Sequence, residues 1–114
     1  MHELGIAQNI VDTVLLEMQN RKLPAVSAIA LRIGALTDVD PEALVFGFEI
    51  LSKDTVLRQA RLNVERIPVR GVCESCGAPF EVEGYVFVCP GCESRSIKLT
   101  SGTELDIAYL EVPD

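Results

Sequence analysis

The sequence predicts an α+β fold, in which two helices pack on a small mixed three-stranded sheet and a cysteine-rich module is inserted before the last strand. Two amphipathic helical patterns and three alternating strand patterns indicate these elements. All four cysteines fall within residues 71–99, a segment repeatedly broken by glycine and proline. We therefore expect residues 1–69 and 100–114 to form one domain and residues 70–99 to form a second, inserted domain.

The first predicted element is a helix from Glu3 to Asn20, where apolar residues recur at three- and four-residue spacing. These residues are Leu4, Ala7, Val11, Val14, Leu15 and Met18. Pro24 ends the helical pattern. Residues 25–33 then alternate as a strand does, with Ile29, Leu31 and Ile33 on one face. The chain is thus expected to pass from a helix directly into a half-buried strand.

A second helix is predicted from Pro41 to about Leu51. Asp40 can accept hydrogen bonds from the free N–H groups of the first turn, and Pro41 suits the first helical position. Residues 62–69 and 104–112 alternate as strands. Because the glycine-rich module offers the last of these no clear partner, we expect it to rejoin the sheet made by the first two strands.

Composition and charge exclude several classes of function. Hydrophobic residues make up 48% and charged residues 24% of the 114 residues, as is typical of a globular domain. The net charge of -7 disfavours binding to the phosphates of nucleic acid or to anionic membranes. The apolar stretches are shorter than the roughly 20 residues that span a bilayer, and the start lacks the basic region of a signal peptide. We expect a cytoplasmic protein.

The four cysteines form two Cys-x-x-Cys pairs, Cys73 with Cys76 and Cys89 with Cys92. Two residues between thiolates let one turn present both sulfurs, and two such turns supply the tetrahedral sulfur set that zinc prefers. The pattern predicts a zinc ribbon with a closed, structural Zn(II) site. Iron bound as in rubredoxin is an alternative, and paired disulfides are a second one that a reducing compartment disfavours. Glu93 follows the last cysteine where many ribbons have glycine.

The amino terminus carries the chain's one histidine, His2. An interior Cys–His or Ser–His pair is therefore absent, as is any glycine-rich nucleotide loop, and an enzyme is not expected. The amine of Met1 and the amide and imidazole nitrogens of His2 can chelate one ion, and Glu3 can add an amide nitrogen or a carboxylate oxygen. Such nitrogen-rich sets suit Ni(II) or Cu(II). From spacing alone, a simple solvated histidine remains the alternative.

Motifs distributed along the whole chain occur in a distinctive order. They are Met1-His2-Glu3-Leu4, Leu31-Arg32-Ile33-Gly34, Pro41-Glu42-Ala43-Leu44, Phe46-Gly47-Phe48-Glu49, Pro68-Val69, the two cysteine pairs and Ser101-Gly102 before Glu104-Leu105. Together they resemble the HypA/HybF family, the nickel metallochaperones of nickel–iron hydrogenase maturation. The resemblance implies that Met1, His2 and Glu3 bind Ni(II) as transferred cargo, and that the four cysteines bind a structural Zn(II).

The resemblance also implies a nickel-binding domain of residues 1–69 and 100–114 and a zinc-ribbon domain of residues 70–99. Its implied partners are a separate GTPase of nickel insertion and the hydrogenase large-subunit precursor, and self-association as a homodimer stays open. From the residues alone, two other classes of protein also stay open. One is a zinc-ribbon adaptor of transcription or translation, and the other is a small iron–thiolate electron carrier.

Overall fold

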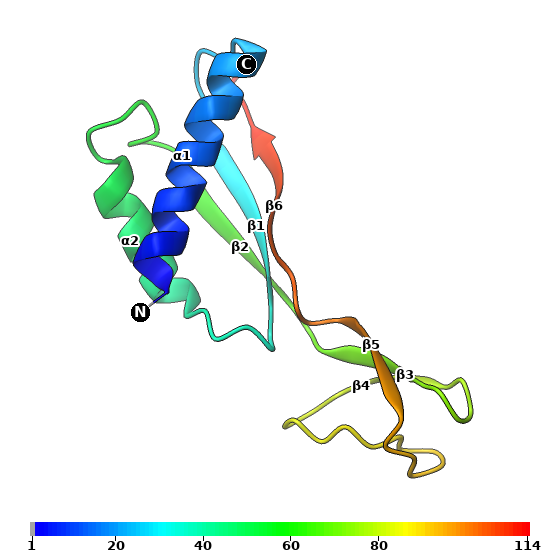
Figure 1. The fold of residues 1–114 in the computed structure, drawn as a ribbon. Coiled ribbons are helices and arrows are strands. Elements are labelled where there is room, and N and C mark those ends of the chain that lie inside the picture. The colour runs from blue at the N-terminus through cyan, green and yellow to red at the C-terminus, as the bar shows by residue number, and fades with distance from the viewer. Residues whose placement is uncertain (1) are drawn as a thin grey trace. The chain divides into compact units, whose positions relative to one another are not determined.

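The computed structural model describes residues 2–114 and contains, within them, two helices and six strands (Figure 1). Their order is α1 (Glu3–Arg21), β1 (Ala28–Gly34), α2 (Pro41–Ser52), β2 (Arg61–Ile67), β3 (Arg70–Cys73), β4 (Pro79–Glu81), β5 (Ile97–Ser101) and β6 (Leu105–Glu111). The predicted α+β class is confirmed. No helix in this part of the chain is both long and apolar enough to cross a membrane.

The chain divides into two compact units. The first comprises Met1–Arg32, Val39–Glu65 and Asp106–Asp114, and the second comprises Ile33–Asp38 and Arg66–Leu105. The second unit contains all four cysteines. The two functional domains assigned from the sequence, residues 1–69 with 100–114 and residues 70–99, stay predictions.

The first sheet has the strand order β2-β1-β6. Backbone hydrogen bonds at the strand ends show the directions. Between β1 and β2, Arg61 N–H donates to the carbonyl of Ser27 and Ala35 N–H to that of Ile67; between β1 and β6, Ser27 N–H donates to the carbonyl of Glu111 and Gly34 N–H to that of Glu104. Along β1, the residue numbers of the partners therefore increase on β2 and decrease on β6. As a result, β2 is parallel and β6 antiparallel to β1, so the sheet is mixed and the last strand joins it, as predicted.

The helices α1 and α2 approach each other closely at Gly47 of α2. A Cβ at that position would lie 3.5 Å from both Ala7 Cβ and Leu4 Cδ1, so a glycine allows the two helices to approach closely. The buried face of α1 consists of Ala7, Ile10, Val11, Val14 and Met18. Leu4 was predicted to belong to this face; it lies in the first turn of α1, next to Gly47, and is 56% exposed.

The helix α2 begins as the sequence predicts. Asp40 Oδ1 accepts hydrogen bonds from the backbone N–H groups of Glu42, at 3.0 Å, and Ala43, at 3.5 Å. Pro41 occupies the first turn, where its missing N–H costs nothing. Leu44 and Phe48 are fully buried on the inner face. The cap thus fixes the start of α2, which lies beside the start of α1 in the first unit.

The second sheet has the order β4-β3-β5, with both neighbours antiparallel to β3. Gly71 in the centre of β3 lies opposite Phe80 on one side and Leu99 on the other. The strand β3 ends at Cys73. This small sheet therefore holds the first cysteine at the end of its central strand.

Candidate metal centre

The four cysteines lie on two tight turns that share one backbone pattern. In each turn, the first cysteine's N–H donates to the carbonyl five residues later, and its own carbonyl accepts from the N–H four residues later. The distances are 3.0 Å (Cys73 to Ala78) and 2.7 Å (Gly77 to Cys73) in the first turn, and 2.9 Å (Cys89 to Ser94) and 2.9 Å (Glu93 to Cys89) in the second. Each turn therefore presents its two sulfurs from a fixed backbone.

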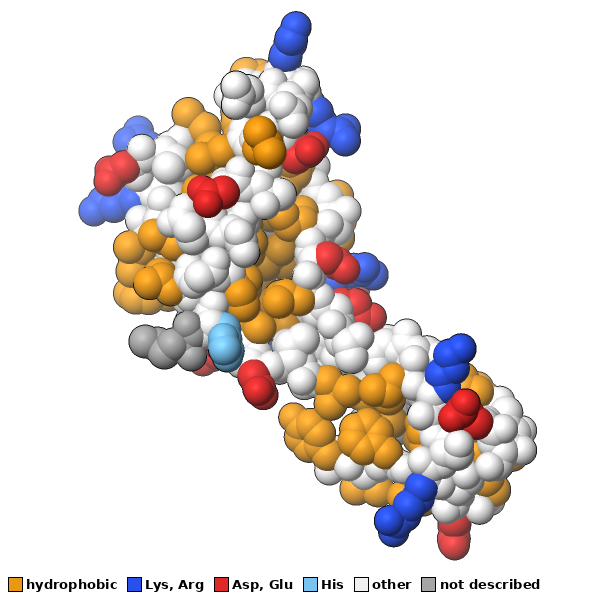
Figure 2. Space-filling view, in the orientation of Figure 1, with side chains coloured by type: hydrophobic (Ala, Val, Ile, Leu, Met, Phe, Trp, Pro, Cys, Tyr) orange, Lys and Arg blue, Asp and Glu red, His pale blue; other side chains and the backbone are white. Residues whose placement is uncertain are grey.

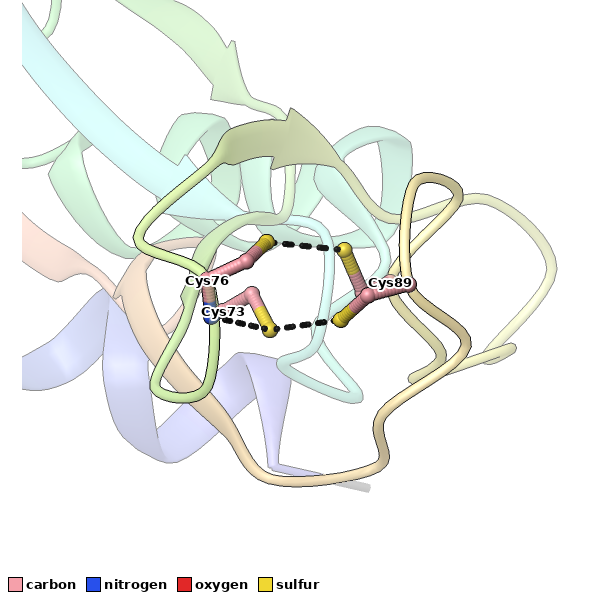
Figure 3. Close-up of side chains that lie close together, drawn as sticks. Cys73, Cys76 and Cys89 are labelled. Atoms are coloured by element: carbon pink, nitrogen blue, oxygen red, sulfur yellow. Dashed lines mark hydrogen bonds between the residues drawn. The ribbon is translucent and has the colours of Figure 1, made fainter.

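The four Sγ atoms gather within 4.8 Å of one another (Figure 3). The sulfurs of Cys73 and Cys92 are 3.5 Å apart, and those of Cys76 and Cys89 are 3.7 Å apart. These distances are too long for disulfides, which are about 2.05 Å. They are close to the separation of about 3.8 Å between the corners of a tetrahedron with metal–sulfur bonds of about 2.3 Å. Within residues 2–114, no other three metal-ligating side chains converge in this way.

The backbone around the sulfurs stabilises thiolates. The N–H of Cys76 lies 3.4 Å from Cys73 Sγ and lowers the pKa of that thiol to about 6. The N–H of Cys92 likewise lowers the pKa of Cys89. The N–H of Ser94 also lowers the pKa of Cys92, but the three neighbouring sulfurs and burial together outweigh it and raise that pKa to about 12. The N–H of Ala78 likewise lowers the pKa of Cys76, but two neighbouring sulfurs and burial outweigh it and raise that pKa. Four adjacent thiolates thus need a cation, and a divalent ion would bind with release of protons.

Serine side chains also join the two cysteine turns. The Oγ atoms of Ser75 and Ser94 lie 2.9 Å apart, and Ser96 Oγ donates to Glu74 Oε1 at 3.0 Å. These contacts connect residues 19 and 22 positions apart in the chain. The spacing of the cysteines did not predict them, since exposed serines have no distinguishing pattern in a sequence.

Glu93 has a φ of 63° and occupies the same place in the second turn as Gly77, with a φ of 79°, in the first. A residue other than glycine is strained in this left-handed backbone conformation, because its Cβ lies too close to the following carbonyl oxygen. We expect Glu93→Gly to raise the unfolding free energy of the metal-loaded protein by about 0.5–1 kcal/mol in denaturant titrations. Glu83→Gly is the matched control, because Glu83 is exposed with an ordinary φ, and it should be neutral or destabilising. Equal changes in unfolding free energy for the two substitutions would show that the backbone at Glu93 is not strained.

The predicted nickel ligand His2 is the N-cap residue of α1. Its side chain is exposed and makes no capping hydrogen bond (Figure 2, pale blue). Its carbonyl accepts the N–H of Ile6 at 2.9 Å. This is an i to i+4 bond of the first turn, so the amide of Glu3 precedes the first intrahelical donor. The imidazole is therefore exposed to a ligand, and the amide of Glu3 makes no intrahelical bond but donates to its own carboxylate. Met1 lies outside the described residues.

The carboxylate of Glu3 is engaged within the protein. Its Oε2 accepts a hydrogen bond from the backbone N–H of Asp40 at 3.0 Å. This bond lowers the pKa of Glu3 from its ordinary value, since it stabilises the charged form. It joins the starts of the two helices, 37 positions apart in the chain. The sequence identified Asp40 as a helix cap but gave no sign that its N–H would hold Glu3.

The family model described as "Hydrogenase/urease nickel incorporation, metallochaperone, hypA" matches residues 1–112. The hydrogenase maturation factor HypA of Geobacter metallireducens is 43% identical over 112 residues, which are 98% of this chain and 99% of that protein. The factor of the same name from Desulfatibacillum aliphaticivorans is 40% identical over 117 residues, covering 100% of this chain and 88% of that protein. These likenesses extend over both units of the chain.

Two solved structures share the fold. The solution structure of the Ni metallochaperone HypA from Helicobacter pylori superposes with a TM-score of 0.69 at 22% identity, covering 98% of this chain and 97% of that one. A solution structure of HypA protein superposes with a TM-score of 0.75 at 22% identity, covering 99% of this chain and 97% of that one. The class of protein is thus a metallochaperone of nickel incorporation in hydrogenase maturation, and not an enzyme. The chain belongs to the HypA family.

Proposed function

We propose that this chain binds Ni(II) through Met1, His2 and Glu3 and delivers it, in the cytoplasm, to the precursor of the hydrogenase large subunit. The observation that carries the proposal is that the first turn of α1 leaves nitrogen donors without helix hydrogen bonds. There the His2 imidazole is exposed without a capping bond, next to the amide of Glu3, which makes no intrahelical hydrogen bond. Nitrogen donors of this kind suit Ni(II). Their affinity for the ion should rise with pH, because imidazole and amide must lose protons to bind.

Within this proposal, Glu3 contributes its amide nitrogen and not its carboxylate. The carboxylate already accepts the N–H of Asp40, and moving it to a metal would leave the start of α2 without that bond. The amide, in contrast, lies before the first intrahelical donor. Together with the Met1 amine and the amide and imidazole of His2, it completes four nitrogen donors in fused chelate rings.

The four cysteines, in the same proposal, hold a structural Zn(II). The support is the set of sulfur separations near 3.8 Å and the N–H groups that favour thiolates. Four thiolates saturate a tetrahedral ion and leave no position for chemistry or exchange. A closed cage suits an ion that stays, whereas an exposed chain end suits an ion that is transferred. The two sites would therefore have separate tasks.

The proposed partners follow from what the chain lacks and from its family. No Gly-Lys-Ser/Thr loop occurs in the sequence, so a nucleotide-driven step of nickel insertion would require a separate GTPase. The recipient is the hydrogenase large-subunit precursor. A homodimer stays a prediction from the sequence, and none of these assignments involves nucleic acid.

The substitution Glu3→Pro tests the amide donor directly. Proline removes the amide N–H at the first helical position, which Glu3 occupies in α1. It also disfavours the αR conformation of His2 before it, so amide spectra of α1 accompany the titration. We expect it to reduce nickel affinity by at least about 100-fold, since a ligand is lost. The matched control Glu3→Ala also removes the carboxylate but keeps the amide, and should retain nickel at one ion per chain. Isothermal titration of untagged protein distinguishes them; equal affinities would contradict the amide ligand.

A further inference from the structure

The last strand of the first sheet is an apolar edge. In the order β2-β1-β6, the strand β6 has β1 on one side and, among residues 2–114, no strand on the other. Three apolar side chains on or just after it are well exposed, namely Leu105 at 44%, Tyr109 at 61% and Val112 at 49%. An exposed apolar edge is a template for pairing with a further strand.

A groove of about 580 Å³ runs beside this strand within the first unit. One wall is α1 and the segment after it, through Thr13, Val14, Glu17, Arg21 and Leu23; the other is Ile107, Ala108, Tyr109, Leu110 and Val112. Successive strand residues point to opposite faces of a sheet. Because four consecutive residues of β6 line one groove, its wall includes the edge of the strand and not only one face.

The opposite edge of the same sheet is protected. The strand β2 carries three charged side chains, Arg61, Glu65 and Arg66, in its seven residues. Charged side chains on an edge strand discourage pairing with other chains. The strand β6 has Asp106 and Glu111, but Asp106 is neutralised by Arg32, which donates from Nε and Nη2 to its two carboxylate oxygens at 2.9 Å each. A smaller groove of about 380 Å³ also lies between α2 and β2, but the charged side chains of β2 make β6 the more favourable edge for pairing.

The acidic side chains on and after β6 indicate which kind of segment could pair with this edge. Residues 106–114 contain three acidic side chains and no lysine or arginine. Within residues 2–114, Glu111 and Asp114 have no ion-pair partner, and Arg21 at the groove is occupied by Glu17 at 2.6 Å. A second copy paired through residues 106–114 would bring no lysine or arginine to these carboxylates, so it offers them no counter-ion, whereas a basic segment does.

We propose that β6 and its groove bind an extended segment of a basic partner protein by strand addition, with apolar residues alternating with lysine or arginine. Main-chain hydrogen bonds to the free edge supply affinity, and the groove receives every second side chain. The basic residues would pair with Glu111 and Asp114. This surface shares no residue with the proposed nickel site and does not depend on it.

The test uses synthetic, end-capped peptides matched to the seven residues of β6, with valine alternating with lysine or with glutamate. We expect the lysine peptide to bind at least about tenfold more tightly, from the charge of the facing pairs. Amide spectra should then shift within Leu105–Glu111 and Thr13 to Leu23. A lysine peptide methylated on alternate backbone nitrogens should lose binding, because it cannot pair with the edge. Absence of binding by the lysine peptide, or equal binding of its methylated form, would overturn the proposal.

Three variants complete the design. Ala108→Lys places a charge on the exposed edge of β6 and should weaken peptide binding about tenfold. Asn63→Lys makes the matched change at an exposed position of β2 and should leave binding unchanged. Binding should also persist in His2→Ala, which separates this surface from nickel. A chain that sediments as a dimer and becomes monomeric with Ala108→Lys would assign the edge to a second copy and overturn the basic partner.

Discussion

Replacing His2 with alanine should abolish nickel retention while leaving the fold and the zinc content unchanged. The imidazole is exposed and makes no capping bond in α1, so its loss removes a ligand without removing a structural contact. Loss of a group that merely supports a ligand costs 10–100-fold in affinity, so loss of the ligand itself should cost more than about 100-fold. Elemental analysis of untagged protein, after nickel exposure and desalting, measures this directly.

The matched control for this experiment is Asn9→Ala, an exposed change on the same helix. It should retain one nickel per chain at wild-type affinity. If His2→Ala bound nickel as tightly as Asn9→Ala, the proposed site would be wrong. Loss of nickel from both variants, with an altered α1 in amide spectra, would point to the helix and not to the imidazole.

Removing the metal from the four cysteines should unfold β3, β4 and β5 while α1, α2 and their core persist. The second unit has few buried apolar side chains, among them Val69 and Val82, besides the two buried cysteines. Zinc bound to small domains of this kind contributes about 10–16 kcal/mol of apparent binding free energy, which becomes folding free energy. We expect hydrogen-exchange protection of the β3–β5 pairing to collapse on chelation or in Cys89→Ala.

Acid should produce the same result as chelation, because protons compete with the ion for thiolates. The matched control is Ser75→Ala, which removes the bond between Ser75 and Ser94 but no sulfur, and should keep its zinc. Full protection of the β3–β5 amides in metal-free protein would contradict a structural role for the ion. A coloured, redox-active protein as isolated would instead indicate iron.

Local signals allowed much of this fold to be predicted. The apolar spacing of α1, the cap at Asp40 and the alternation of β1 act within one element, and the structure confirms them. The paired Cys-x-x-Cys spacing likewise brought four distant sulfurs into one expected cluster, which the structure contains. Such features depend on residues a few positions apart, so a single sequence carries them.

Contacts between distant segments could not be predicted in this way. The bond from Asp40 to Glu3 depends on how α1 meets α2, and so does the exposure of Leu4 opposite Gly47. The strands β3, β4 and β5 have three to five residues each, too few for alternation to be recognised among glycines and prolines. The first cysteine turn connects β3 to β4, whereas β5 pairs with β3 from beyond the second turn.

The two cysteine turns have different consequences for the folded chain and for the unfolded one. Cys76 and Cys89 are separated by a short segment, so an ion held by both closes a small loop. A covalent link closing a loop of this length removes unfolded-state entropy worth about 3 kcal/mol. An ion bound by both turns would close the same loop only in the folded module, because its binding free energy is gained on folding and lost on unfolding. The unfolded chain therefore stays unrestrained, while the folded module has a cross-link that thiol reductants cannot open, where a disulfide would be reduced.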